Sequence, residues 1–174
     1  RWICRRRRRV VCWPSCAKPE NLGTLVRAAE GCYDGAKAYR TPFVSGKDSL
    51  NNQLKYIDPA TGRERVIEIP PTLLITGLGI VSDINRCVSM DAKKPGNALL
   101  LIGKTMDAMG GSHFQRLEAL NAGSERSVSP VPTTDLSAGP RTARLIFDLI
   151  QKGLIASAHD VSDGGLLIAI AEML

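Results

Sequence analysis

Aromatic residues are scarce in this chain, at 5% of its 174 residues. A surface that stacks nucleic-acid bases needs several of them, so a base-stacking platform is not indicated. The chain has two histidines and five cysteines, and none of the cysteines belongs to a Cys-x-x-Cys pair. The sequence therefore lacks the residue spacing that is typical of a zinc site. An odd number of cysteines without such pairs is typical of reduced thiols in a cytoplasmic protein.

Long apolar runs are also missing. No stretch reaches the roughly 18 apolar residues of a membrane span, and the start of the chain lacks the apolar segment of a signal peptide. We therefore expect a cytoplasmic chain that does not cross a membrane.

The positive charge of the chain is concentrated at its start. The formal net charge is +6, and six arginines stand at position 1 and positions 5–9. Without these six, 17 Lys and Arg would balance 17 Asp and Glu, so the body of the chain is neutral. Because five successive guanidinium groups cannot be buried in a strand, residues 1–10 are expected to be a disordered tail or foreign sequence. A nucleic-acid-binding arm is the third interpretation.

The first half of the chain is predicted to contain one helix and several strands. Apolar residues at three- and four-residue steps predict a helix over 20–39, which includes Cys32 as a small core residue and ends before Pro42. A turn at 58–62 between two alternating segments predicts a hairpin. Strands are therefore expected at 43–44, 54–57, 65–69, 72–81 and 87–90. The run 72–81 is mostly apolar and should be buried.

The second half should again combine strands and helices. Continuous apolar runs predict buried strands at 98–102 and 154–158. Helices are predicted after the N-cap Ser112, over 141–152 and up to Leu174, with Ser162 or Asp163 as the last N-cap and a Ser/Pro-rich loop at 122–136. The final helix is apolar and would be left uncovered, so we expect the chain to be a fragment of a longer protein.

These elements predict an α+β fold in two domains. The polar segment 93–97 contains a Pro-Gly pair and is the expected linker. The first domain would span residues 11–92 and the second residues 98–174.

The segment from Phe43 to Asn52 is the most informative one for function. A short apolar strand is expected to lead into a polar loop that holds Gly46, Lys47, Asp48 and Ser49. A glycine lets backbone N–H groups approach a phosphate, a lysine neutralises charge, a carboxylate can hold hydrated Mg²⁺, and a hydroxyl can donate to an anionic substrate. The alternative is a polar turn without a ligand.

Two further segments offer similar chemistry. His159, Asp160 and the Ser-Asp-Gly-Gly sequence that follows precede a helix, where an anion or a Mg²⁺–phosphate group can bind. The alternative is that these residues only fix the loop and cap the helix. Gly110, Gly111 and Ser112 could cradle a phosphate or form a tight turn with a cap.

Together, five segments resemble the phosphoribosylformylglycinamidine synthase (formylglycinamide ribonucleotide amidotransferase) family, in its PurL-type subunit. They occur in the family's order, from about Cys12 to the end of the chain, which suggests a fragment of the C-terminal half. They are Gly31-Cys32-Tyr33-Asp34, the segment from Thr41 to Ser49, Pro95-Gly96-Asn97, Gly110-Gly111-Ser112-His113-Phe114, and the segment from His159 to Gly165.

The resemblance implies a fold, an activity and site residues. The fold would be part of an aminoimidazole-ribonucleotide-synthetase-like N-terminal domain followed by its C-terminal α/β domain. Gly46 and Lys47 would bind nucleotide, Ser49 would bind substrate, and Asp160 would ligate Mg²⁺ at an auxiliary nucleotide site. Lys47 stands where many members have a metal-binding asparagine, and a protonated lysine cannot ligate a metal.

The implied reaction is the ATP- and Mg²⁺-dependent conversion of formylglycinamide ribonucleotide to its amidine. A glutaminase subunit and a small bridging subunit are the implied partners. The family's catalytic histidine lies in an earlier half, so the chain alone is expected to be inactive. Two alternatives remain: another synthetase of the superfamily, for selenophosphate, thiamine monophosphate or aminoimidazole ribonucleotide, or a nucleic-acid-binding module that uses the arginine tail.

Overall fold

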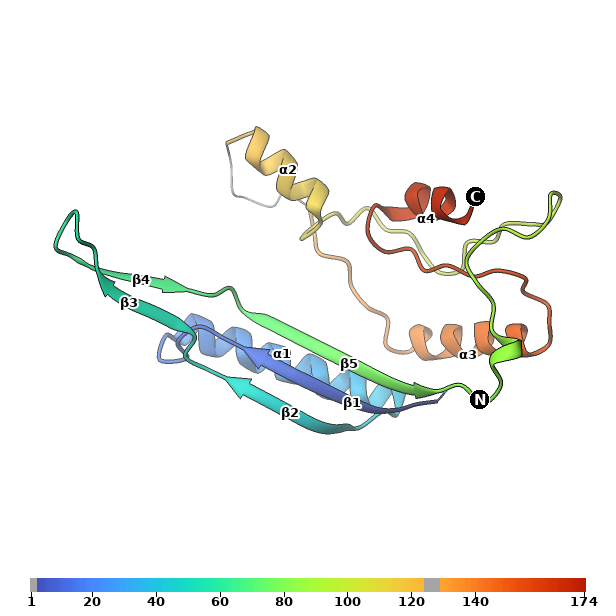
Figure 1. The fold of residues 1–174 in the computed structure, drawn as a ribbon, viewed down its shortest axis with the longest axis horizontal. Helices are drawn as coiled ribbons and strands as arrows, with labels where there is room; N and C mark the ends of the chain where they lie inside the picture. The colour runs from blue at the N-terminus through green and yellow to red at the C-terminus, as the bar shows by residue number, and fades with distance from the viewer. Residues whose placement is uncertain (1–2, 124–128) are drawn as a thin grey trace. The chain divides into compact units, whose positions relative to one another are not determined.

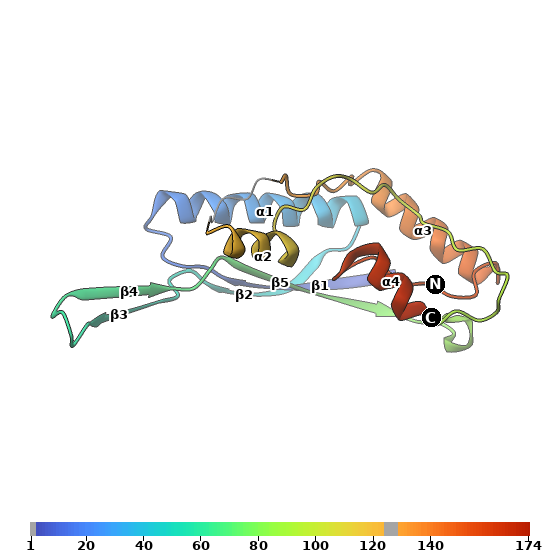
Figure 2. The ribbon, with the colours of Figure 1, turned by 90° about the horizontal axis from the view of Figure 1, so that it is seen from above.

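The computed structural model describes residues 3–123 and 129–174. The chain divides into two compact units, Arg1–Asn85 and Arg86–Leu174, which together have a mixed α and β composition (Figures 1 and 2). The division falls before the segment 93–97, which the sequence favours as a linker. The domain bounds 11–92 and 98–174 stay a prediction.

A three-stranded sheet and a helix form the body of the first unit. β1 (Ile3–Cys12) is the central strand, parallel to β2 (Phe43–Ser49) and antiparallel to β5 (Thr72–Ile80). The helix α1 (Pro19–Tyr39) joins β1 to β2 and lies along one face of the sheet (Figures 1 and 2). Parallel neighbours need such a crossover because a tight turn cannot join them.

Helix α1 confirms the sequence prediction. Pro19 stands in its first turn, where the missing N–H would have no helical partner. The helix ends at Tyr39 and is followed by the C-cap Arg40, whose φ of 51° is left-handed. Cys32 is buried, as predicted, but three residues of the same apolar pattern are exposed, namely Leu22, Val26 and Tyr33.

Trp13 connects the end of β1 to the start of α1. Its side chain is buried, and its Nε1 donates to Thr24 Oγ1 at 2.9 Å and to Asn21 O at 3.2 Å. Its main-chain N–H donates to Ser49 O at 2.8 Å, and its carbonyl accepts from Asn52 N at 2.9 Å. The residue therefore fixes the strand ends of the sheet relative to the helix.

The arginine run lies in β1, so the expected disordered tail is not what residues 3–10 form. β1 pairs with β2 on one side and β5 on the other. The expectation failed because pairing the backbone of a strand does not require burying its charges. Arg8 is exposed, and the Arg7 guanidinium lies 5.5 Å from the centre of the Tyr39 ring. A free arm for nucleic acid is not formed by these residues.

The predicted hairpin is confirmed. β3 (Gln53–Ile57) and β4 (Glu64–Glu68) form a separate antiparallel pair. In the turn, Asp58 Oδ1 accepts from Ala60 N at 2.9 Å, and Asp58 O accepts from Gly62 N at 2.7 Å. The Ala60 bond is the largest of the causes that lower the pKa of the Asp58 carboxyl.

β5 is a strand, as predicted, but it is not buried. Leu74 and Leu78 are 59% and 62% exposed. By the register, Leu74 lies beside Val10 on the sheet face away from α1. The helix covers only the other face, so an apolar composition alone did not predict burial here.

The regular secondary structure of the second unit, in its described residues, is helical. After the 3₁₀ turn η1 (Ile84–Arg86) come α2 (His113–Asn121), α3 (Ala138–Gln151) and α4 (Gly165–Met173). Ser112 caps α2, as predicted, because its Oγ accepts from Gln115 N at 3.2 Å. Among the described helices, none combines the length and apolar composition that a bilayer crossing requires.

The strands predicted at 87–90, 98–102 and 154–158 are wrong, since no described residue of the second unit is in a strand. An apolar run fits a strand only where a neighbouring strand supplies hydrogen-bond partners, and sequence does not reveal that neighbour. Leu99 and Leu100 are instead exposed. The loop predicted at 122–136 includes residues 124–128, which lie outside the described residues.

The cap predicted for the last helix is also wrong. The N-cap of α4 is Gly164, and neither Ser162 nor Asp163 caps the helix with its side chain. Gly164 has a φ of 81°, and a Cβ there would lie 2.5 Å from Ile168 Cγ1. This start of the helix therefore depends on glycine rather than on a capping side chain.

Candidate functional site

The four candidate residues of segment 46–49 lie in a strand rather than in a loop. β2 extends to Ser49 and pairs with β1. Successive side chains of a strand point to opposite faces. Gly46 and Asp48 therefore face α1, whereas Lys47 and Ser49 face away from it. The loop expected over these four residues is therefore wrong, because they belong to a strand that directs them to two faces.

Lys47 and Ser49 meet on the sheet face away from α1. Lys47 Nζ donates a hydrogen bond to Ser49 Oγ. Lys47 is exposed and Ser49 is half-buried. An ammonium and a hydroxyl side by side offer several donors to an anion such as a phosphate. The structure thus brings together the candidate nucleotide-binding lysine and the candidate substrate-binding serine.

Gly46 lies against Arg9 of the neighbouring strand. The two residues are in register, and a Cβ at Gly46 would come within 3.3 Å of Arg9 Cγ and 3.5 Å of Arg9 Nε. The space that the glycine leaves open is therefore taken by an arginine side chain. This contact explains the glycine structurally, without a nucleotide.

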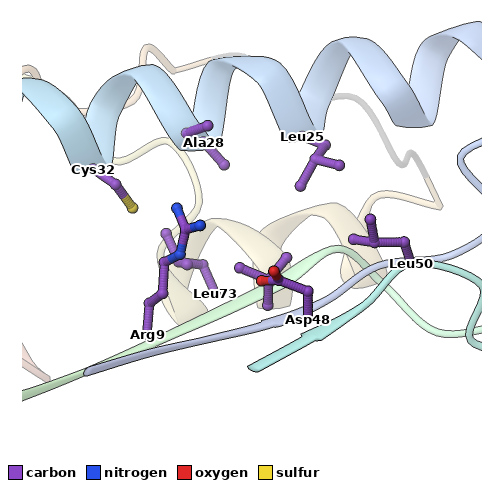
Figure 3. A pocket seen from close by; sticks show the side chains of 9 residues that line it. Arg9, Leu25, Ala28, Cys32, Asp48, Leu50 and Leu73 are labelled. Atoms are coloured by element: carbon purple, nitrogen blue, oxygen red, sulfur yellow. The ribbon is translucent and has the colours of Figure 1, made fainter. Parts of the chain in front are cut away.

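A pocket of about 200 Å³ lies between the sheet and α1. Figure 3 shows Arg9 and Asp48 rising from neighbouring strands toward the helix, with Leu25, Ala28 and Cys32 on the helix above them. The remaining lining is apolar and includes Val11, Leu50 and Leu73. The pocket is mostly apolar and holds one charge of each sign.

The sequence does not identify Arg9 as a site residue, because it predicts that residues 1–10 form a tail. The signal that could have identified it is the apolar sequence Val10-Val11-Cys12-Trp13 that follows directly, which continues the run as a strand. A strand that includes Val11 on the covered face also places Arg9 there, two residues earlier.

Asp160 belongs to the second unit and lies beside a histidine. His159 Nδ1 is 3.4 Å from Asp160 Oδ1, and His159 Nε2 is 2.7 Å from Glu172 Oε2 of α4. The Glu172 hydrogen bond, followed by the weaker Asp160 contact, raises the pKa of His159 against the opposing effect of desolvation. The histidine is mostly covered, whereas the Asp160 side chain is 85% exposed.

No group of three or more His, Cys, Asp or Glu side chains that could hold a metal occurs in residues 3–123 and 129–174. Asp160 offers a single exposed carboxylate. Such a donor suits Mg²⁺ only when water and phosphate oxygens complete the shell. The side chains therefore fit a Mg²⁺ ion that arrives with a nucleotide, and they do not form a resident metal centre.

The Gly110–Gly111 turn is filled by the protein itself. Gly110 N donates to Pro130 O at 2.9 Å, and Gly111 N donates to Gln115 Oε1 at 3.1 Å. A Cβ at Gly110 would lie 2.5 Å from Ser129 O. Because both N–H groups already have partners, the turn interpretation fits better than the phosphate cradle.

Comparison with known proteins gives matches in both units. Residues 94–174 match the family model "AIR synthase related protein, C-terminal domain". The chain is 34% identical over 156 residues to the phosphoribosylformylglycinamidine synthase subunit PurL of Methylocella silvestris, and 36% identical over 159 residues to that of Erythrobacter litoralis. Each match covers 90% of this chain, but only 19% and 21% of the respective relatives.

The PurL subunit of Caulobacter vibrioides gives a similar match, at 34% identity. The chain therefore spans about a fifth of the length of the curated relatives it matches. These matches confirm the resemblance that the five segments carry. The chain is similar to PurL subunits over 90% of its length, and its residues 94–174 match the AIR synthase related C-terminal domain.

Proposed function

We propose that this chain is a part of an ATP-dependent ligase that converts formylglycinamide ribonucleotide to formylglycinamidine ribonucleotide in purine biosynthesis. The observation that carries the proposal is the 34% identity to PurL subunits over 90% of the chain. The contact between Lys47 and Ser49 supports it, because the resemblance assigns these two positions to the nucleotide and the substrate. We keep the cytoplasm as its proposed location.

Each candidate residue has a role in this proposal. The Lys47 ammonium would attract a nucleotide phosphate as a point charge, and Ser49 would donate a hydrogen bond to the substrate. The serine would then exchange its Lys47 contact for a ligand contact. Gly46 would bind nucleotide only through its backbone, because the Arg9 side chain takes up the space on the α1 side of the glycine. Asp160 would supply one carboxylate oxygen to Mg²⁺.

The nucleotide would supply the activating phosphoryl group for the substrate amide oxygen. Ammonia would come from a glutaminase subunit, which a small bridging subunit would help to attach. The first unit would correspond to part of a synthetase-like N-terminal domain, packed against a second sheet. The second unit would correspond to the C-terminal domain. We expect the 174 residues by themselves not to turn over substrate.

A chimera tests this proposal directly. The 156 matched residues of the Caulobacter vibrioides subunit would be replaced by those of this chain. The chimera should restore growth without purines to a strain that lacks its own subunit. It should also form the amidine in vitro from ATP, substrate and ammonia. Ammonia as the donor removes any dependence on the glutaminase contact.

Variants of the chimera separate a specific loss from general damage. Ser49→Ala should lower kcat/KM by roughly tenfold, because it removes one hydrogen bond to a charged ligand. Ser137→Ala is the matched control, since the Ser137 side chain makes no cap bond in α3. A soluble, folded chimera without amidine formation would refute the proposal, as would equal losses in the two variants.

A further inference from the structure

The pocket under α1 holds two charges that the protein leaves without partners. Among the described residues, neither the Arg9 guanidinium nor the Asp48 carboxylate has a hydrogen bond or ion pair, and both line the same cavity (Figure 3). Arg9 is half-buried, and Asp48 is exposed at the edge of the cavity. A charged group beside apolar walls is unfavourable unless a partner compensates it.

Their spacing leaves room for a ligand between them. Arg9 is in register with Gly46, and Asp48 with Val11, so the Cα atoms of Arg9 and Asp48 are offset by two residues along the strands. Two residues of a strand span about 6.6 Å. Gly46 leaves the space into which the Arg9 side chain extends. Because both side chains line one cavity, the guanidinium and the carboxylate can contact two neighbouring charged groups of one small solute.

The size and walls of the cavity limit what can enter. Its volume of about 200 Å³ is smaller than the roughly 300–1,000 Å³ of pockets for drug-sized ligands. Because one water molecule takes up about 30 Å³, the cavity has room for a solute about as large as seven water molecules. Val11 on the sheet side and Cys32 on the helix side are buried, whereas Leu50 is exposed. Such walls suit a short aliphatic group.

We propose that this pocket binds an aliphatic α-amino acid. The ligand's carboxylate would pair with the two-pronged Arg9 guanidinium, and its ammonium group with Asp48. Its side chain would lie against Leu25 and Leu73. This site is separate from Lys47 and Ser49, which point to the other face of the sheet, and it does not depend on the function proposed above.

The test is calorimetric titration of the full chain with L-leucine. Saturable binding and a rise in melting temperature are expected at millimolar concentration. N-acetyl-leucine lacks the ammonium charge and leucinamide lacks the carboxylate, so each should bind at least tenfold more weakly than leucine. Absence of saturable leucine binding, or equal affinity for all three compounds, would overturn the proposal.

Two variants connect the binding to the charges. Arg9→Leu and Asp48→Asn should each weaken leucine binding at least tenfold. Arg8→Leu is the matched control, because Arg8 lies on the opposite face of the same strand and is exposed. Arg9→Leu should fold at least as stably as the parent chain, since it removes an unpaired charge from apolar walls. Unchanged leucine affinity in Arg9→Leu, or an equal loss in Arg8→Leu, would reject the site.

Discussion

His159 Nε2 lies 2.7 Å from Glu172 Oε2 and so connects the segment before α4 to the last turn of that helix. Asp160 stands on the other side of the ring, with 3.4 Å between Nδ1 and Oδ1. The imidazolium form can therefore interact with two carboxylates. The raised pKa of His159 follows from this arrangement, with Glu172 as the larger cause.

The first prediction concerns the pH dependence of this contact. Because the folded-state pKa of His159 is raised, its stabilising contribution is fully present below about pH 6.5 and is lost as the pH rises through the folded-state pKa. Glu172→Gln should lower the pKa measured by NMR titration more than Asp160→Asn does. It should also flatten the decline in urea-unfolding stability above about pH 6.5. An equal effect of both variants would contradict the order of causes.

The second prediction concerns the bond between Trp13 and Thr24. Trp13→Phe keeps most of the buried ring but removes the indole donor, so it should cost about 1–3 kcal/mol. Trp13→Ala should cost about 3–5 kcal/mol because it also leaves a cavity. Urea unfolding measures both values. In combination with Thr24→Val, Trp13→Phe should cost less than the two single changes together, and strict additivity would argue against the bond.

Local signals predicted the local structure well. The periodic apolar residues of α1, the turn at Asp58 and the Ser112 cap each depend on residues close in sequence, and all three were confirmed. The arginine run shows the limit. Side-chain charge predicts whether a segment can be buried, but β1 is held by backbone pairing to β2 and β5, which lie far away in the sequence.

The candidate site shows the same limit. The composition of segment 46–49 suggested groups that can bind anions, which stays a prediction, and the motif order indicated the resemblance that the comparisons confirm. It could not show that a strand would separate these groups onto two faces. The apolar residues after the arginine run could have placed Arg9 on the covered face of a strand, but they could not show that it lies beside Gly46.

The third prediction compares two serines at helix starts. The Ser112 side chain caps α2, whereas at the start of α3 the Asp135 carboxylate accepts from Ala138 N at 2.8 Å in place of Ser137. Ser112→Ala should therefore cost about 1 kcal/mol, and Ser137→Ala close to nothing. Thermal unfolding of the two variants checks this difference. Similar costs would mean that the caps are not used as described.

The fourth prediction compares two neighbouring glycines. Gly164 and Gly165 both have positive φ, at 81° and 73°, but only at Gly164 would a Cβ collide, with Ile168. Gly165→Ala should cost about 1–2 kcal/mol from backbone strain. Gly164→Ala should cost more, and the added Ile168→Ala should recover part of the difference. Urea unfolding measures these costs. If Gly165→Ala cost more than Gly164→Ala, the contact with Ile168 would not be the cause of the difference.

The last prediction concerns the exposed face of β2. Lys47 is exposed, and a single ion pair between an exposed side chain and a ligand adds about 0.2–1 kcal/mol to the binding free energy. Lys47→Met should therefore weaken binding of ATP to the chain by roughly 1.4- to fivefold, and added salt should reduce the difference between the parent chain and the variant. Lys55→Met on β3 has the same change in charge and should have no such effect. Fluorescence titration with a labelled nucleotide measures both. Equal weakening would mean that net charge, rather than the position beside Ser49, governs the affinity.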